Sequence, residues 1–268
     1  MVLTEKEFLQ IVSFIKQNYG VDLAGKKTLV EGRLASVMAK GGYGTYSELL
    51  ARVYKNPLGE EASTLVNSLT TNHTYFLREP EHFHFLKETA LPELAGKNSM
   101  FKDLGIWSAA ASSGEEAFTI AMIIRDYFGS DAKKWDTTIL ATDISTKALS
   151  IANAGIYDAD RISNLPAAWL RDYFERQQDG NYKICDEIRR QVLFRTFNLM
   201  NPFNFKRRFH IVFLRNVMIY FDDATKQELL KKVYDAMEPG GYLFIGVTEI
   251  IDRKGLDFTM IQPSIYKK

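Results

Sequence analysis

The first seventy residues place apolar side chains at helical spacing. Thr4 and Glu7 have the spacing of a capping box, and Phe8, Ile11 and Phe14 follow on one helical face. Glycine- or proline-containing turns separate three further helix candidates, at 27–40, 46–54 and 60–69. This pattern predicts a small all-α N-terminal domain, which we place at residues 1–75.

From residue 104 onward, short apolar runs alternate with helical patterns. The runs predict strands at 104–109, 137–142, 192–197, 209–214, 241–247 and 257–266. Helices are expected at 115–128, 145–154 and 223–237, with an earlier one from Pro80 to about Leu94. The alternation predicts an α/β fold for residues 76–268, a doubly wound, Rossmann-like and mostly parallel sheet. We expect the last predicted strand to form a hairpin that adds an antiparallel strand at the end of the sheet.

Residues 159–190 break this alternation, and we place an insertion at about residues 160–195. Asp179-Gly180 lies between polar and alternating residues, which is a hairpin signal. We predict a small inserted β subdomain here. An exposed docking surface and a simple connecting flap both fit its weak apolar alternation.

Composition excludes several functions for the 268 residues. Net charge is +1 and the pI is about 7.7, so no overall field attracts nucleic acid or membranes. The single Cys185 excludes an internal disulfide and fits a reducing cytoplasm. No apolar run approaches the ~20 residues of a membrane span, and the charged start does not fit a signal peptide. The four histidines lack metal-ligand spacing, so we expect no metal site and predict surface or capping roles for them.

The strongest signal for a ligand site lies between Leu104 and Asp143. The pattern there predicts a strand, a turn, a helix and a second strand that ends in an acid, which is typical of an α/β unit that binds a nucleoside. Asp143 ends the second strand, where a carboxylate can accept hydrogen bonds from ribose hydroxyls. The turn has one glycine, Gly114, where a dinucleotide-binding turn has three, and Glu115 and Glu116 follow directly. These acids would repel a pyrophosphate and attract a cation, which favours S-adenosylmethionine. The alternative is that they only stabilise the first turn of a helix.

Further candidates lie at later strand ends. Asn198 and Leu199 could contact an adenine, although an asparagine also commonly ends a strand at a turn. Arg215 and Asn216 interrupt an apolar stretch, and burying such groups without partners costs several kcal/mol. They should therefore be paired or line a cavity. Tyr220 follows them and could equally be a core aromatic residue.

The polar segment 70–79 joins the two predicted domains, and such a junction is a common place for a cleft. Arg78 lies in it with Asn72 and Thr74, and a guanidinium binds carboxylates through two parallel hydrogen bonds. A surface salt bridge to Glu79 or Glu81 is the alternative for Arg78.

Four segments together resemble the CheR family of chemotaxis receptor methyltransferases: TTNHTYFLREPEHF (70–83), IWSAAASSGEEAFTIAM (106–122), ILATDIST (139–146) and FLRNVMIYFDDAT (213–225). The resemblance implies a protein-glutamate O-methyltransferase that uses S-adenosylmethionine, leaves S-adenosylhomocysteine and acts on cytoplasmic helices of chemoreceptors. In some members the inserted subdomain docks a receptor tail peptide.

The resemblance also implies roles for individual residues. Arg78 and Tyr220 would act in catalysis, with Tyr220 near the transferred methyl group. The cofactor would be bordered by Asn72, Thr74, Arg78, Ala109, Ala110, Glu116, Asp143, Ile144, Asn198, Leu199, Arg215 and Asn216.

Two departures from the family pattern stand out. Ala35 and Ser36 occupy positions that can be basic in the second helix, so attraction to an acidic receptor could be weaker. Val247 and Thr248 replace His and Ser of a common Gly-His-Ser-Glu segment, but Glu249 remains, and we expect no loss of activity.

The residues alone leave other functions open. A nicotinamide-dependent oxidoreductase on a similar fold is disfavoured by the missing glycines. A protein that binds S-adenosylmethionine and receptors without turnover is a second alternative. A nucleic-acid methyltransferase is disfavoured by the near-neutral charge. We expect a cytoplasmic monomer.

Overall fold

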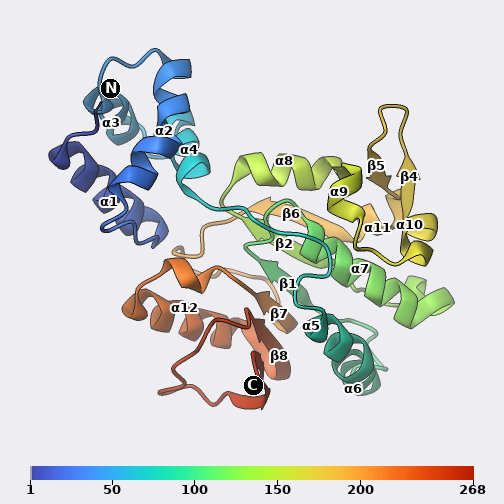
Figure 1. Ribbon diagram of the computed structural model, residues 1–268. Coiled ribbons are helices and arrows are strands. Elements are labelled where there is room, and N and C mark those ends of the chain that lie inside the picture. Colours follow the sequence, from blue (N-terminus) through green and yellow to red (C-terminus); the bar gives the residue numbers. More distant parts are fainter. Residues whose placement is uncertain (1) are drawn as a thin grey trace.

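The computed structural model describes residues 2–268, and its first part is a bundle of four helices with its own apolar core (Figure 1). The capping-box prediction is confirmed, because the Thr4 side chain accepts from the Glu7 N–H and the Glu7 side chain accepts from the Thr4 N–H. Glu7 also accepts hydrogen bonds from Ser47, which ties the first helix to the third. The helices are α1 (Glu5–Tyr19), α2 (Lys27–Gly41), α3 (Tyr46–Lys55) and α4 (Glu60–Leu69).

The second part is built on a seven-stranded sheet with the order β6-β2-β1-β7-β8-β10-β9. Its first five strands are parallel, and the last two add antiparallel pairs, so the predicted α/β class is confirmed. The strands are β1 (Ile106–Ala109), β2 (Ile139–Asp143), β6 (Val192–Thr196), β7 (Phe209–Leu214), β8 (Met237–Ile245), β9 (Thr259–Gln262) and β10 (Ile265–Lys267).

The end of the sheet differs from the prediction. The expected single strand at 257–266 is two strands, because the chain turns at Pro263 and Ser264 and Ser264 has a left-handed φ of 63°. The second of them, β10, pairs with β8, and β9 takes the outer edge. Pro263 is a local signal for this turn that the prediction does not use, because apolar residues continue on both sides of it.

Alternate residues of the central strands pack into different layers. Ile106 faces one side of the sheet, with α5, α6 and α7, while Trp107 faces the other side, with α12 (Figure 1). Such alternation is what a sheet covered on both faces requires. The helices are α5 (Pro80–Phe85), α6 (Leu91–Lys97), α7 (Glu115–Phe128), α8 (Thr146–Ala154) and α12 (Asp223–Ala236). A short π-helix (Leu86–Ala90) lies between α5 and α6, and a 3₁₀ helix (Gly129–Lys134) follows α7.

The predicted insertion forms a three-stranded antiparallel sheet with the order β3-β5-β4. Gly180 lies in the β4–β5 turn with a φ of 84°, as the Asp-Gly signal requires. The elements are β3 (Ile156–Tyr157), α9 (Ala159–Ile162), α10 (Ala167–Tyr173), β4 (Phe174–Arg176), β5 (Tyr182–Ile184) and α11 (Asp186–Arg190).

The helical bundle lies against the carboxyl ends of the parallel strands. Asn67 of α4 donates to the Thr146 hydroxyl at 3.1 Å and accepts from the Ser145 hydroxyl at 2.9 Å, which joins α4 to the start of α8. Val21 forms an isolated antiparallel bridge with Phe221. None of the helices described in residues 2–268 is long and apolar enough to cross a bilayer.

Candidate cofactor and active site

A cavity of about 300 Å³ lies where the helical bundle meets the carboxyl ends of β1, β2, β6 and β7. Its position follows the rule that ligands of open α/β sheets bind outside these strand ends. The cavity floor, as we call it, consists of residues at or just after the ends of these strands: 110–112, 116, 143–144, 197–199, 215–217 and 220–221. The cavity roof consists of the residues Tyr19, Val21, Leu23, Lys26, Leu29 and Arg33 from the helical bundle.

The structure brings nearly all of the predicted site residues together around this cavity. Ala109 is the exception, because it is fully buried among apolar side chains on the α12 side of the sheet and does not line the cavity. It ends β1, so its side chain follows the alternation of the strand. The predicted residues that line the cavity are Asn72, Thr74, Arg78, Ala110, Glu116, Asp143, Ile144, Asn198, Leu199, Arg215, Asn216 and Tyr220.

Backbone donors hold Asp143 at the end of β2. One carboxylate oxygen accepts from the Ser112 N–H and the other from the Ser145 N–H, each at 2.8 Å. Burial raises the pKa of Asp143, and these hydrogen bonds oppose the shift. Each oxygen keeps a second lone pair, so the carboxylate can still accept from a ligand hydroxyl.

Glu115 and Glu116 follow one another in α7 but point to different places. Glu115 is fully buried and pairs with Arg161 of the inserted subdomain at 2.9 Å, so the expectation that both acids face the ligand is wrong for Glu115. Glu116 lines the cavity, where it accepts from the Ser108 hydroxyl at 2.7 Å and from Arg215 at 2.8 Å. Successive helical residues are rotated by about 100°, which explains the separation.

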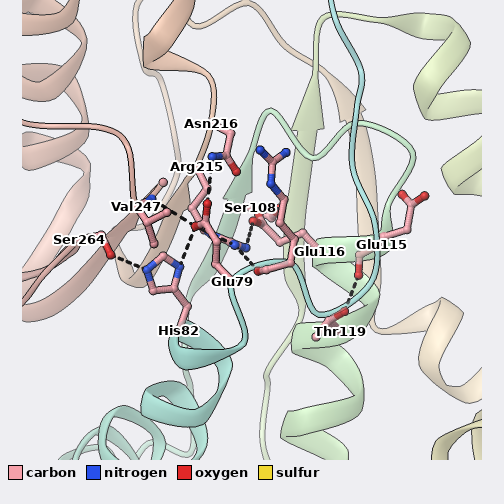
Figure 2. A network of polar contacts seen from close by, with 12 residues as sticks. Glu79, His82, Ser108, Glu115, Glu116, Thr119, Arg215, Asn216, Val247 and Ser264 are labelled. Carbon is pink, nitrogen blue, oxygen red and sulfur yellow. Dashed lines mark hydrogen bonds and ion pairs between the residues drawn. The ribbon is translucent and has the colours of Figure 1, made fainter. Parts of the chain in front are cut away.

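Arg215 is the centre of a buried polar network (Figure 2). Its side chain is 2% exposed and binds Glu116, the Arg78 carbonyl and Glu79, the last at 3.1 Å. Glu79 also accepts from the Asn216 amide at 3.1 Å and from the Val247 N–H at 3.3 Å. The sequence predicts for Glu79 only a surface salt bridge with Arg78; the signal for its buried role is that an arginine within an apolar stretch requires an acidic partner.

A second buried carboxylate joins the loops after β7 and β8. Glu249 accepts from the N–H groups of Asn216 at 2.9 Å, Met218 at 2.7 Å, Ile219 at 3.3 Å and Gly246 at 2.6 Å. Burial raises the pKa of Glu249 against these four hydrogen bonds. The contacts fix the short 3₁₀ turn (Met218–Tyr220) that carries Tyr220 to the cavity.

The segments around the cavity also share an unusual backbone. Leu77, Glu79, Ala110, Ser112 and Asn216 all have φ between 50° and 59°, the left-handed region that non-glycine residues rarely adopt. Each such residue costs on the order of 1 kcal/mol and persists only where its surroundings enforce it. Strained residues of this kind concentrate at binding and catalytic sites.

Arg78 reaches the cavity from the segment that joins the two parts of the chain. Its guanidinium donates to the His73 carbonyl at 2.9 Å and lies 5.9 Å from the centre of the Tyr75 ring. Neither Glu79 nor Glu81 forms an ion pair with it among the described residues, so the salt-bridge alternative is wrong. Its remaining N–H groups are available to a ligand.

Sequence models of one family match both parts of the chain. Residues 72–266 match the model described as "CheR methyltransferase, SAM binding domain", and residues 6–70 match "CheR methyltransferase, all-alpha domain". The chain belongs to the CheR methyltransferase family. The boundary that we predict after residue 75 lies slightly beyond the end of the second match and stays a prediction.

Three relatives that match this CheR methyltransferase over nearly their whole length are 33–38% identical to it. A "Chemotaxis protein methyltransferase" of Borreliella burgdorferi is 38% identical over 271 residues, which cover 99% of this chain and 95% of the relative. "Chemotaxis protein methyltransferase Cher2" of Pseudomonas putida is 34% identical, covering 96% and 95%. The Escherichia coli "Chemotaxis protein methyltransferase" is 33% identical, covering 99% and 92%.

The cofactor of this CheR methyltransferase is S-adenosylmethionine, and the cavity fits its chemistry. The Ser112 N–H, which could have faced a phosphate, donates to Asp143 instead. Glu116 stands at the start of α7, where a pyrophosphate would otherwise rest. Asp143 and Glu116 therefore suit ribose hydroxyls and a cationic group. Leu23, Ile144 and Leu199 supply apolar surface.

The sequence of this CheR methyltransferase does not predict that the helical bundle forms the roof of the cavity. The Asp22 N–H donates to the Tyr220 carbonyl at 2.8 Å, and the Asn198 amide donates to the Asn18 carbonyl at 2.6 Å. Asn198 thus borders the cavity while one of its two amide hydrogens holds the roof. These contacts join residues far apart in sequence, and no local pattern signals them.

One histidine differs from its predicted surface or capping role. His82 is 1% exposed, its Nε2 lies 2.6 Å from the Ser264 hydroxyl, and its Nδ1 lies 3.4 Å from Glu79. Burial lowers the pKa of His82 to about 4, and Arg215 adds to the effect. His82 therefore packs as a neutral core residue beneath the network of Figure 2.

Proposed function

We propose that this chain transfers a methyl group from S-adenosylmethionine to glutamate side chains of chemoreceptors and forms methyl esters. The names of its full-length relatives, chemotaxis protein methyltransferases, support the chemoreceptor as substrate. The resemblance of segments 70–83 and 213–225 to receptor methyltransferases supports glutamate as the acceptor.

One observation carries the choice of a carboxylate acceptor. Arg78 and Tyr220 border the cavity, while the nearby acids Asp143, Glu116 and Glu249 are held by hydrogen bonds. An amine or hydroxyl acceptor would call for a base to remove its proton. A glutamate has an ordinary pKa of about 4.3, so at neutral pH it is already an anion and requires no base.

The proposed reaction is a direct displacement. S-adenosylmethionine, when bound, supplies an electrophilic methyl group on a positively charged sulfur. Arg78 would orient the incoming carboxylate so that one oxygen forms the new bond to carbon, while the electron pair of the broken bond goes to sulfur. Alignment of the reacting atoms can supply several kcal/mol of the required acceleration. Arg78 must not bind the anion too tightly, because the ester product is neutral.

Tyr220 would help to enclose the reacting groups. The Glu249 carboxylate fixes the turn that carries it, and the Asp22 N–H binds its carbonyl. Two parts of the chain therefore hold this side chain at the cavity. Its role would be position and hydrogen bonding rather than proton transfer.

The test uses purified protein, labelled S-adenosylmethionine and the cytoplasmic fragment of a chemoreceptor from the same organism. We expect label on the receptor that mild base releases as methanol, because a glutamate methyl ester is base-labile. A receptor fragment with glutamine or alanine in place of its methylated glutamates is the matched control. Binding of receptor and cofactor without transfer would indicate a sensor or scaffold, and base-stable label would indicate another acceptor.

Three narrower proposals accompany this function. The enzyme would act in the cytoplasm and as a monomer, in keeping with the single Cys185 and the near-neutral charge. The inserted subdomain would dock a receptor tail peptide, since β4 is an edge strand of its small sheet with Glu175 and Arg176 exposed. Pull-down with and without the last residues of the receptor tests this docking.

A further inference from the structure

Three large apolar side chains are exposed on the loops that follow β7 and β8. Ile219 is 50% exposed, Val247 is 58% exposed and Ile250 is 87% exposed. None of them lines the cavity, so contact with the cofactor does not explain their apolar character. We call these three residues the apolar patch. Exposed apolar side chains that gather at one place commonly mark a surface that binds another protein.

The two loops of the apolar patch are held against each other. The Glu249 carboxylate accepts from the Ile219 N–H at 3.3 Å and from the Gly246 N–H at 2.6 Å, and the Glu249 N–H donates to the Gly246 carbonyl at 2.9 Å. A Cβ atom at Gly246 would clash with the Asn216 amide, so the loops approach as closely as a glycine allows. The patch is therefore one fixed surface and not two independent loops.

The apolar patch adjoins both residues that we place beside the methyl acceptor. Ile219 directly precedes Tyr220, which lines the cavity. The Val247 N–H donates to Glu79 at 3.3 Å, and Glu79 follows Arg78 in the chain (Figure 2). The patch thus lies outside the cavity, next to the side chains that an acceptor would meet.

The size of the cavity requires a protein substrate to contact the surface around it. A cavity of about 300 Å³ has the size of a small-molecule site, so a protein can insert only a side chain and must rest its backbone outside. On an α-helix, residues three and four positions apart lie on one face, about 5–6 Å from each other. A helix that presents a glutamate to Arg78 therefore brings neighbouring side chains against the surface beside Arg78.

We propose that the apolar patch is a docking surface for the apolar flank of the receptor helix that carries the target glutamate. The helix places its glutamate on Arg78 and buries adjacent apolar side chains against Ile219, Val247 and Ile250, which removes apolar surface from water on both partners. The contact strengthens receptor binding and favours glutamates that have apolar neighbours over glutamates surrounded by charge. This inference rests on the function proposed above and adds the surface by which the enzyme distinguishes one glutamate from another.

The experiment compares methylation of the receptor fragment by the wild-type protein and by the triple variant Ile219→Ser/Val247→Ser/Ile250→Ser. Serine removes apolar surface without adding charge and keeps the backbone N–H groups that hold the loops. Because the three side chains are exposed, the variant should unfold in urea as the wild-type protein does. The matched control is Met100→Ser/Phe101→Ser, which changes side chains that are 85% and 79% exposed before β1, at the opposite end of the parallel strands from the cavity.

We expect KM for the receptor fragment to rise about tenfold in the triple variant while kcat stays within about twofold, because the lost contacts bind substrate and transition state alike. Salt does not screen apolar contacts, so the increase should be the same at low and at high ionic strength. Affinity for S-adenosylhomocysteine, measured by calorimetry, should be unchanged. The control variant should match the wild-type protein in each measurement.

An unchanged KM in the triple variant would overturn this inference and leave the proposed function standing. So would an increase that disappears at high ionic strength, or a parallel loss of S-adenosylhomocysteine affinity, which would mean that the patch shapes the cavity. Wild-type dimers that the triple variant loses in sedimentation, with KM unchanged, would make the patch an interface between two copies of this chain. Absence of receptor methylation by the wild-type protein would overturn the proposed function and the docking surface with it.

Discussion

The floor and the roof of the cavity are built in different ways. Within the sheet domain, backbone donors hold the floor carboxylate of Asp143, through Ser112 and Ser145, and the carboxylate of Glu249 beside the floor, through four N–H groups. The roof is attached through a few polar contacts, such as those of Asn67 and Asn198. The residues that would bind the cofactor are thus held in place within the sheet domain. Enclosure of the cofactor depends on how the helical domain docks onto that domain.

The segment between floor and roof should be the most sensitive to mutation. Replacing Arg78 by Ala should lower kcat at least ~100-fold, because the carboxylate acceptor loses its orienting partner. Affinity for S-adenosylmethionine should fall only a few-fold, since the floor is intact. Steady-state methylation and calorimetry measure the two effects. Arg52→Ala, on the far helix α3 where Arg52 pairs with Glu61, is the control, and unchanged turnover in Arg78→Ala would defeat the assignment.

The contrast also explains what could be predicted from sequence. Asp143 ends a strand, and Glu116 and Asn216 lie seven and two residues after one, so the local pattern of apolar run, turn and polar residue is enough to select them. Glu79 could not be assigned in this way, because its partner Arg215 is 136 residues further along the chain. The roof likewise depends on tertiary packing, which a single sequence does not display.

Breaking the floor should reduce both stability and activity. Glu249→Gln places an amide among four N–H donors, so donors that were paired lose their acceptor. We expect a loss of about 3 kcal/mol in the free energy of unfolding, measured with urea, and lower kcat through misplacement of Tyr220. Thr248→Ala, at an exposed neighbouring position, should leave both unchanged. A fully stable Glu249→Gln protein would show that these bonds do not organise the floor.

Lowering the pH should reduce the free energy that His82, buried beneath the floor, contributes to folding. The folded pKa of His82 is about 4, below the ordinary 6.5, so between these values the unfolded chain binds a proton that the folded chain does not. The contribution of His82 to the free energy of unfolding should therefore fall by about 3 kcal/mol as pH drops from 6.5 to 4, and this contribution should level off below pH 4. The groups facing His82 are Glu79, Arg215 and Ser264.

Unfolding by urea at several pH values tests this dependence. His82→Gln should be less stable at neutral pH but should lack the His82 contribution to the slope between pH 6.5 and 4. His84→Gln changes an exposed histidine of the same helix and should keep the slope of the wild-type protein. Equal slopes in all three proteins would contradict the buried, neutral state of His82.

Loosening the roof should have the smallest effect. Asn67→Ala removes the contacts to Thr146 and Ser145, which are worth about 1 kcal/mol together at a partly exposed site. We expect cofactor dissociation to become a few-fold faster by stopped-flow, with little change in the unfolding of the sheet domain. Asn153→Ala serves as the control, because the Asn153 side chain donates to the Leu149 carbonyl within α8 and the structure of residues 2–268 gives it no contact to the roof. A large loss of overall stability would mean that roof and floor are not separate parts.

A crystal structure of the protein with S-adenosylhomocysteine tests the central claim most directly. The account predicts the ligand between floor and roof, with its ribose hydroxyls on Asp143, its ammonium near Glu116 and its sulfur directed toward Arg78 and Tyr220. A ligand bound elsewhere, or a ribose outside hydrogen-bond distance of Asp143, would contradict it.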